Sequence, residues 1–449
     1  MTKNKKILLS LPTAIAARNF FQSGVVDALV SESRFDLIVV CPPLTQKIYA
    51  NSDSRVTFRS DMHRQNHWVL RILLFLQRRR FYYVKPTASS EIIKIAPLFR
   101  SFGHRFGPMV TFPFSNSAKV LKALESLSSK LGRYIYRDLA VELDQENFDL
   151  VIVTHPTDSK EFPIKVAAKA CSLKVVGCIK SFDNLTTKGY IFPLDNHYIV
   201  WNRMMVDELK YLYDFPRSET SIIGVLQFDP YFRKKAKALN KTLSSIESCK
   251  FRILYAASPP MITPDDPEIV RALVNKLSPK KFEICVRVHQ MDDYRRWENL
   301  EGVEIIGLDQ DLGRSTFQRI ADTNHVSGLT ENLCWSDVVV VTCSTMMLDA
   351  TCFSKPVINI GFNYPCIRQK SLDVKRFYAF DHYKEIVSSP LFQLALSIEE
   401  LERMIIELAH KSSTCEKETA LLLDSYVPYR DGRTVDRFVA SITKIVDSE

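Results

Sequence analysis

The chain has 449 residues, enough for two or three domains of ordinary size. Its 46% hydrophobic and 25% charged residues are typical of a globular protein, and no run of 18 apolar residues is present to span a bilayer. The net charge of +9 suits phosphate-bearing ligands or an anionic membrane surface, but it is too diffuse to indicate nucleic-acid binding.

Cysteine and glycine usage excludes several further classes of site. The ten cysteines are scattered without a C-x-x-C pair or a metal-ligand cluster, which indicates reduced thiols in a cytosolic protein. Only 13 glycines occur, and neither G-x-G-x-x-G nor G-x-x-x-x-G-K-[ST] is present. A phosphate site in this chain must therefore use helix ends capped by hydroxyl side chains.

The N-terminus begins with lysines followed by an apolar stretch, a pattern that resembles a signal peptide. Pro12 cuts the apolar core short, and a helical pattern continues directly from Ala16. We therefore expect the first strand and first helix of an α/β domain.

The first half of the chain alternates predicted strands with predicted helices. Strands are expected at 7–11, 35–41, 150–154, 174–179, 197–201 and 222–224, and helices at 14–30, 67–85, 121–143 and 161–170. The segment 67–85 has an apolar centre, three arginines (Arg78, Arg79 and Arg80) and aromatic residues beyond them. Two interpretations stay open: a core helix with a solvated basic end, or a helix that lies on an anionic membrane surface.

The second half repeats the alternation after a basic, serine-rich stretch at 233–250, which is the best predicted domain boundary. Strands are expected at 252–256, 282–288, 303–306, 338–342 and 357–360, and helices at 268–277, after 345, and at 397–410, 416–426 and 434–446. The predicted fold class is α/β with two Rossmann-like, doubly wound domains. The expected domains are 1–235 and 251–410, with C-terminal helices at 411–449 that could pack back on the first domain.

The segment 336–362 reads as strand, hydroxyl-rich turn, helix and strand. Ser344 or Thr345 is a natural N-cap, and the free N–H groups of the helix start form an anion site. Asp349 follows one turn later and could reach the ribose of a nucleotide whose diphosphate lies at the cap. The alternative is an ordinary βαβ unit with a serine cap and a solvated aspartate.

Other strand ends in the second half carry polar residues. Ser258 follows the strand at 252–256, and Arg287 and His289 share one face of a strand end because side chains alternate. An arginine and a histidine there would neutralise a leaving diphosphate. The triplet 309–311 (D-Q-D) resembles a metal-binding pattern, but such triplets arise easily by chance and no metal site is predicted.

Several motifs together resemble one group of enzymes. They are S-F-D-N-L-T-T-K-G (181–189), V-W-N (200–202), G-V-L-Q-F-D (224–229), R-V-H-Q (287–290) and S-D-V-V-V-V-T-C-S-T-M-M-L-D-A (336–350) followed by K-P-V-I (355–358). The chain resembles GT-B type enzymes of bacterial cell-surface polysaccharides over about residues 150–365. Similar families are capsule and O-antigen (lipopolysaccharide) glycosyltransferases, CDP-glycerol glycerophosphotransferases and UDP-N-acetylglucosamine 2-epimerases.

The resemblance implies two Rossmann-like domains facing a cleft, with the donor nucleotide on the C-terminal domain. Ser344 and Thr345 match the phosphate-binding turn of the family, and Asp349 matches the acidic residue expected on the ribose, where many relatives carry glutamate. Arg287 and His289 match an R-x-H-P motif whose proline is replaced here by glutamine.

The activity implied by the resemblance is transfer of a sugar from a nucleotide-sugar donor to a hydroxyl of a polysaccharide or lipid-linked acceptor. No metal or cofactor is expected, and the expected place is the cytoplasm, peripherally on the inner face of the plasma membrane. A base would activate the acceptor, and the candidates are Asp183, His155, Asp158 and Glu161. Asp183 ranks first because its loop is distinctive, although Asp183 and Asn184 could merely fix that loop.

Three alternatives stay open at this point. The chain could be a CDP-glycerol-type glycerophosphotransferase or a nucleotide-sugar 2-epimerase, which has no second substrate. It could also be a non-catalytic scaffold at the membrane, an interpretation that depends on the basic aromatic segment 67–85.

Overall fold

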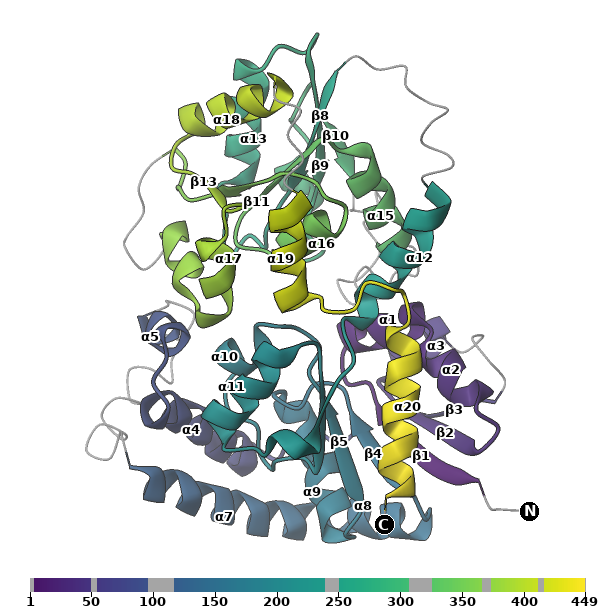
Figure 1. Cartoon of the computed structure of the whole chain (residues 1–449). Helices are drawn as coiled ribbons and strands as arrows, with labels where there is room; N and C mark the ends of the chain where they lie inside the picture. Colours follow the sequence, from purple (N-terminus) through teal and green to yellow (C-terminus); the bar gives the residue numbers. More distant parts are fainter. Residues whose placement is uncertain are drawn as a thin grey trace. The chain divides into compact units, whose positions relative to one another are not determined.

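The computed structural model describes residues 4–49, 55–95, 117–238, 250–306, 325–365, 373–410 and 416–448. The chain divides into two compact units, each described here by itself. The first unit comprises Met1–Lys94, Leu98–Asp229 and Val427–Glu449, and the second comprises Ile95–Pro97 and Pro230–Tyr426. Each unit is a parallel sheet flanked by helices (Figure 1), which confirms the predicted α/β class with two Rossmann-like parts.

The first unit contains a seven-stranded parallel sheet in the order β3-β2-β1-β4-β5-β6-β7. The strand order reverses between β1 and β4, which pair with Ile7 opposite Leu150. Most of these strands are continuous apolar runs because helices cover both faces of the sheet. Their bounds are β1 Lys5–Ser10, β2 Phe35–Val40, β3 Thr57–Arg59, β4 Leu150–Val153, β5 Lys174–Cys178, β6 His197–Val200 and β7 Thr220–Ile222.

Helices of the first unit connect these strands. They are α1 Ala14–Ser23, α2 Val25–Ser31, α3 Pro43–Tyr49, α4 Trp68–Val84, α5 Ala88–Ile95, α7 Ala118–Ile135, α8 Arg137–Gln145, α9 Phe162–Ala170, α10 Asn184–Thr187, α11 Arg203–Tyr213 and α20 Thr434–Asp447. Short 3-10 turns are η3 Ser159–Glu161, η4 Arg217–Glu219 and η5 Leu226–Phe228.

Two predicted helices are each broken into two. The predicted helix 14–30 ends at Gly24, whose φ of 89° lies in the left-handed region and whose N–H bonds to the carbonyls of Phe20 and Phe21. Glycine adopts this conformation without steric cost, so α2 starts in a new direction. The predicted helix 121–143 is interrupted at Tyr136, between α7 and α8.

One face of the first sheet packs against α4, α7, α8 and α9. The cluster joins strand residues such as Leu8 and Val151 with Leu70 of α4 and Leu139 of α8. The last helix of the chain, α20, packs on α2, and its Phe438 meets Phe20 edge-on at a ring-centroid distance of 5.7 Å. The C-terminal segment is therefore part of the core of the first unit.

The second unit contains a six-stranded parallel sheet in the order β10-β9-β8-β11-β12-β13, which reverses between β8 and β11. The strand β13 and the helix α15 were not predicted from the sequence. The strand bounds are β8 Phe251–Ala256, β9 Phe282–Arg287, β10 Glu304–Ile306, β11 Val338–Val341, β12 Val357–Ile360 and β13 Gln393–Ala395.

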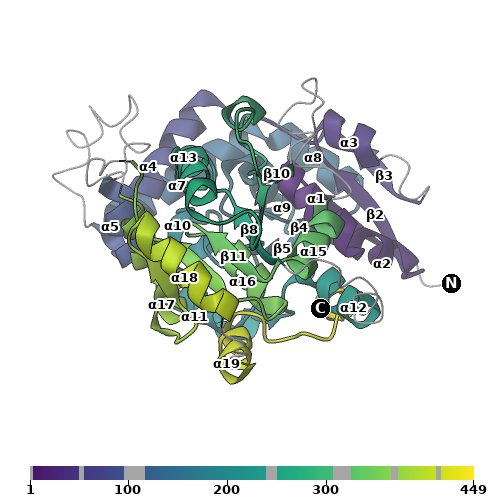
Figure 2. The same ribbon diagram turned by 90° about the horizontal axis from the view of Figure 1, so that it is seen from above.

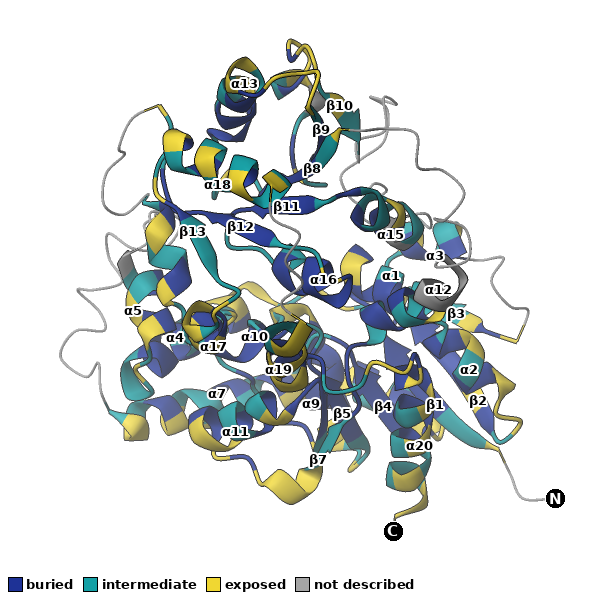
Figure 3. Cartoon of the chain, turned by 45° about the horizontal axis from the view of Figure 1, so that its top comes forward, coloured by how far each residue is buried: buried dark blue, intermediate teal, exposed yellow. Residues whose placement is uncertain are grey.

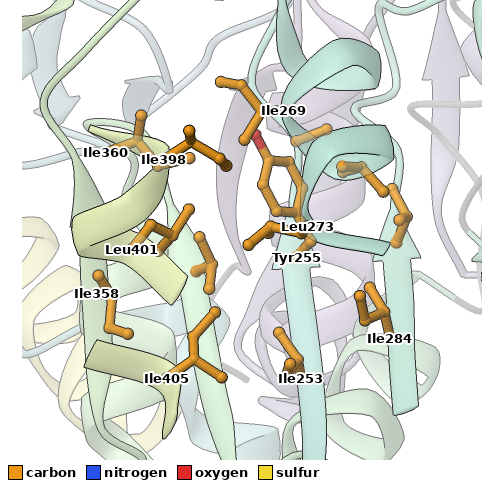
Figure 4. Packing of buried hydrophobic residues seen from close by; sticks show 14 of the residues in the cluster. Ile253, Tyr255, Ile269, Leu273, Ile284, Ile358, Ile360, Ile398, Leu401 and Ile405 are labelled. Carbon is orange, nitrogen blue, oxygen red and sulfur yellow. The ribbon is translucent and has the colours of Figure 1, made fainter. Parts of the chain in front are cut away.

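Helices α13 and α18 pack side by side on the second sheet (Figures 1 and 2). Figure 4 shows Ile398, Leu401 and Ile405 of α18 packed with Ile358 of β12 and Leu273 of α13. The helices of this unit are α12 Asp229–Ala238, α13 Asp266–Lys276, α15 His325–Trp335, α16 Met346–Cys352, α17 Lys384–Ser388, α18 Ile398–His410 and α19 Glu416–Tyr426, with 3-10 turns η7 Tyr294–Arg296, η9 Val374–Ala379 and η10 Asp381–Tyr383.

The D-Q-D triplet at 309–311 lies outside the described residues. Over the described ranges, no group of three or more metal-ligating side chains comes together. No helix in those ranges has both the length and the apolar character needed to cross a membrane.

Candidate functional site

Each sheet has one point where its strand order reverses, and seven of the ten predicted site residues follow the strands on either side of it. The exceptions are Asp183, which follows β5, and Arg287 and His289, which lie at the end of β9. In open α/β sheets, ligands bind beyond the carboxyl ends of the strands at such a reversal. In the second unit the reversal lies between β8 and β11, and in the first it lies between β1 and β4.

Ser258 follows β8 and is only 3% exposed. Its hydroxyl donates to the Thr342 carbonyl at 2.8 Å, and its N–H donates to Asp266 Oδ2 at 2.9 Å. Ser258 therefore ties the end of β8 to the end of β11, and its hydroxyl is engaged within the protein.

The carboxyl of Asp266 accepts several hydrogen bonds from β8 and from the loop that follows it. Besides the Ser258 N–H, it accepts hydrogen bonds from the Tyr255 hydroxyl at 2.7 Å and the Thr263 hydroxyl at 2.8 Å. Burial raises the pKa of Asp266 to about 7, against the lowering effect of these donors. This residue was not predicted, and its only sequence signal was an aspartate at the start of a helix.

The predicted phosphate turn lies between β11 and α16. Residues 343–346 are half-buried, between a buried strand and a buried helix. Ser344 Oγ accepts the Met346 N–H at 3.3 Å, whereas Thr345 is the N-cap without a side-chain hydrogen bond. Cys343 has a φ of 40°, and its N–H donates to the Tyr378 hydroxyl at 3.1 Å. Of the two predicted caps, Ser344 makes the capping bond.

Asp349 lies inside α16 and is 5% exposed. Its Oδ1 accepts the Tyr231 hydroxyl of α12 at 2.6 Å, and the Tyr231 ring meets Phe353 edge-on at 5.2 Å. The carboxylate is thus not the solvated side chain of the alternative interpretation, because a tyrosine from a distant part of the chain holds it. Its contact with a ribose stays a prediction.

Arg287 and His289 flank the buried Val288 and are both half-buried, as expected for alternate residues at a strand end. Arg287 Nη1 donates to Asn332 Oδ1 of α15 at 2.6 Å. His289 Nδ1 accepts the Met291 N–H at 3.1 Å, which closes a tight turn where the family motif has proline. These bonds fix both side chains on the same edge of the sheet as Ser344.

Glu161, one of the predicted bases, is completely buried. Its Oε2 lies 2.7 Å from Ser10 Oγ, and its Oε1 accepts the N–H groups of Thr154 at 3.1 Å and His155 at 3.3 Å. Burial raises the pKa of Glu161 to about 8. This carboxyl joins the ends of β1 and β4 across the strand-order reversal, and its role as a base stays a prediction.

His155, Asp158 and Lys180 form a cluster at the ends of the adjacent strands β4 and β5. The His155 Nδ1 lies 3.1 Å from Lys180 Nζ and 3.4 Å from Asp158 Oδ2, while its buried Nε2 has no hydrogen-bond partner among the described residues. Burial lowers the pKa of His155, so the imidazole is neutral at pH 7. Burial alone would raise the pKa of Asp158, but hydrogen bonds from His155 and the Lys160 N–H hold it at about 2.

Lys180 was not predicted as a site residue. Burial lowers its pKa to about 8, against the attraction of Asp158. It also borders a small cavity of about 20 Å³ with Cys178 and Trp201, a volume that suits a water molecule. Its place directly after the predicted strand 174–179 is the signal that could have identified it.

Asp183, the first-ranked base, is engaged within its own loop. Its side chain contacts Asn184 Nδ2 at 3.0 Å, Thr187 Oγ1 at 3.2 Å and Lys188 Nζ at 3.4 Å. These contacts are those expected if Asp183 and Asn184 fix the loop. Which of the candidate groups acts as the base stays a prediction.

Two tyrosine hydroxyls from neighbouring helices donate hydrogen bonds to backbone carbonyls of the loop 180–189. Tyr82 of α4 donates to the Thr187 carbonyl at 2.9 Å, and Tyr213 of α11 donates to the Leu185 carbonyl at 3.0 Å and the Gly189 carbonyl at 2.8 Å. Gly189 has a φ of 96°, and its Cα faces the Arg78 side chain so closely that no Cβ would fit. The position therefore requires glycine.

Known structures resemble the whole chain in fold. The UDP-N-acetylglucosamine 2-epimerase from Rickettsia bellii has a TM-score of 0.52 at 12% identity, covering 99% of this chain and 97% of that one. The UDP-GlcNAc 2-epimerase from Neisseria meningitidis, bound to UDP-GlcNAc, has a TM-score of 0.51 at 10% identity, covering 98% of this chain and 100% of that one. The S. aureus MnaA–UDP co-structure has a TM-score of 0.51 at 13% identity, covering 99% and 97%.

The chain has a GT-B type fold. No protein-family model and no curated protein sequence matches it. The fold predicted from the motifs is thus confirmed by structure at 10–13% identity, a level at which the likeness shows the fold alone. In this GT-B chain, function depends on the residues of the site and not on the fold.

Proposed function

We propose that this GT-B chain is a glycosyltransferase that moves a sugar from a nucleotide-sugar donor to a hydroxyl of a polysaccharide or lipid-linked acceptor. The observation that carries the proposal is the His155 cluster of the first unit. A neutral imidazole whose Nε2 has no partner among the described residues, with a carboxylate beside its Nδ1, has the groups expected of a general base.

His155 would act through one of its two tautomers. With the proton on Nδ1 and directed at Asp158 Oδ2, the Nε2 lone pair would be left for the acceptor hydroxyl. In this tautomer Nδ1 accepts no hydrogen bond from Lys180, and the buried Nε2 would have to become accessible to the acceptor. The low pKa of Asp158, about 2, keeps its carboxylate ionised to stabilise the imidazolium that forms. The Lys180 ammonium, 3.1 Å from Nδ1, would disfavour a permanently charged ring and so keep the base neutral between turnovers.

The donor nucleotide would bind to the second unit. The N–H groups of Ser344 and Thr345 in the half-buried turn would be offered to a diphosphate, and Arg287 and His289 lie on the same sheet edge to neutralise its charge. We propose that these groups stabilise the leaving nucleotide without a metal ion. UDP is the first donor nucleotide to test, because structures of the same fold hold UDP and UDP-GlcNAc.

A nucleotide-sugar 2-epimerase is the second candidate, because the epimerase from Neisseria meningitidis matches this fold over nearly the whole chain. The two activities differ in their need for an acceptor. UDP-GlcNAc incubated with the chain and no acceptor, followed by NMR, should show only slow hydrolysis if the chain is a transferase. Accumulation of the 2-epimer would refute the transferase and establish the epimerase.

Donor binding can be tested separately by thermal shift with UDP, GDP, CDP, CMP and dTDP, because a ligand that binds only the folded chain raises its melting temperature. The shift should be largest for one nucleotide and should shrink in Asp349→Ala. A shift equal in wild type and variant would remove Asp349 from the donor site.

A further inference from the structure

Helix α4 exposes an apolar face along its first two turns. Trp68 is 65% exposed, Ile72 49% and Phe75 40%. Residues spaced in this way lie on one side of a helix, and Arg71 is exposed beside them. The opposite side of the helix carries Leu70 and Leu73, which are buried in the core of the first unit.

The other end of α4 does not face solvent. Arg79 and Arg80, which the sequence suggested as a basic end for lipid contact, are each only 6% exposed. Tyr82 is buried as well and holds the loop 180–189. That part of the prediction is wrong because the last turns of α4 are packed into the unit.

Helix α7 lies antiparallel to α4. The Gln77 side chain donates to the Leu124 carbonyl at 2.9 Å, and the His67 N–H donates to the Tyr136 hydroxyl at 3.3 Å. Figure 1 shows the two helices side by side, and Figure 3 shows exposed positions along α7. Five of the thirteen exposed large hydrophobic side chains of the described residues lie on α4 and α7: Trp68, Ile72, Phe75, Leu127 and Tyr134.

Exposed charges on α4 and α7 are all positive. Glu125 is the one acidic residue in these two helices, and it is half-buried and accepts a hydrogen bond from the Tyr190 hydroxyl. The exposed charged side chains are Arg71, Lys119, Lys122, Lys130 and Arg133.

We propose that the α4–α7 surface, defined by Trp68, Ile72, Phe75, Leu127 and Tyr134 with these five basic residues, binds an anionic lipid bilayer. Aromatic and aliphatic side chains beside lysine and arginine are the composition that lies at a headgroup boundary. The charge favours lipid over a second copy of this chain, because two such surfaces would repel each other. The inference does not depend on the sugar-transfer activity.

The test is co-sedimentation of the full chain with vesicles of phosphatidylcholine alone or with about 30% phosphatidylglycerol. We expect binding only to the anionic vesicles, weakened by added salt. Trp68 supplies a direct probe because it is the most exposed of the four tryptophans: Trp201 and Trp297 are buried and Trp335 is half-buried. Its fluorescence should shift to shorter wavelength on binding, and this shift should be absent in Trp68→Phe.

The double variant Lys122→Gln/Lys130→Gln should bind anionic vesicles roughly 25-fold more weakly, at about fivefold for each charge near the surface. Lys210→Gln/Lys384→Gln is the matched control, because both lysines are exposed on α11 and α17, outside the α4–α7 surface. Circular dichroism would verify that each variant is folded.

Three outcomes would overturn the proposal. Equal binding to neutral and anionic vesicles would remove the role of charge, and wild-type binding by the lysine double variant would place the contact elsewhere. A dimer that forms without vesicles and buries Trp68 would assign the surface to self-association.

Discussion

The buried Glu161 predicts how the stability of the first unit depends on pH. The pKa of this carboxyl is about 8 in the folded chain against an ordinary value of 4.5. A group whose pKa is raised on folding contributes stability that is complete below the unfolded value and is lost as pH rises toward the folded value. At about 1.4 kcal/mol per pH unit, the loss between pH 4.5 and 8 is about 5 kcal/mol.

Glu161→Gln tests this reasoning because glutamine has the shape of the protonated carboxyl. Its carbonyl can accept the N–H groups of Thr154 and His155, and its amide can donate to Ser10. Urea unfolding should give nearly equal free energies for wild type and variant at pH 5. At pH 8 the variant should be more stable by about 4 kcal/mol.

The difference in free energy of unfolding between wild type and Glu161→Gln at each pH cancels the contributions of the other titrating groups. One of these is Asp266, whose pKa is also raised by burial. Glu32→Gln serves as a control, because Glu32 is exposed in the same unit, and it should follow the wild type at every pH. A difference between wild type and Glu161→Gln that stays constant from pH 5 to 8 would refute the argument.

Three further substitutions test other parts of the structure. His155→Gln should lower turnover by about 10²- to 10³-fold with donor affinity unchanged, as measured by transfer of labelled sugar, and wild-type turnover would exclude His155 as the base. Tyr231→Phe removes the hydroxyl that donates to the buried Asp349 and should lower the free energy of unfolding by about 2 kcal/mol; a loss of less than about 0.5 kcal/mol would show that the bond contributes little. Gly177→Ala places a Cβ against Asp195 and 2.6 Å from the Tyr198 ring, so it should cost more than about 2 kcal/mol, and an unchanged melting temperature would contradict this packing.

The sheets could be predicted from the sequence because each strand is marked by a short, local run of apolar residues. Runs such as 150–153 and 338–341 are apolar throughout, as strands covered on both faces must be. The break at Gly24 also had a local signal, a glycine within an amphipathic pattern. The break at Tyr136 had no local sequence signal. The hydroxyl of this tyrosine contacts Asn66, 70 residues earlier in the chain, and such a contact cannot be predicted from neighbouring residues.

The site residues also divide into those with a local sequence signal and those that depend on residues distant in the chain. The capping role of Ser344 follows from its residue type and position, so it could be predicted. The burial of Glu161 depends on Ser10, 151 residues away, and the hydrogen bond of Asp349 depends on Tyr231, 118 residues away. A periodic pattern of apolar residues cannot predict such pairs, because they form only when distant parts of the chain come together on folding.

The order in which the chain forms its two units determines which fragments can be expressed separately. The second unit is almost one continuous segment, Pro230–Tyr426, whereas the first is completed by Val427–Glu449 after that segment. Expression of Pro230–Tyr426 alone is therefore a reasonable route to a separate fragment of the second unit. A fragment that stops at Asp229 would lack α20 and leave Phe20 uncovered, so the first unit would need the C-terminal segment supplied through a short artificial connector.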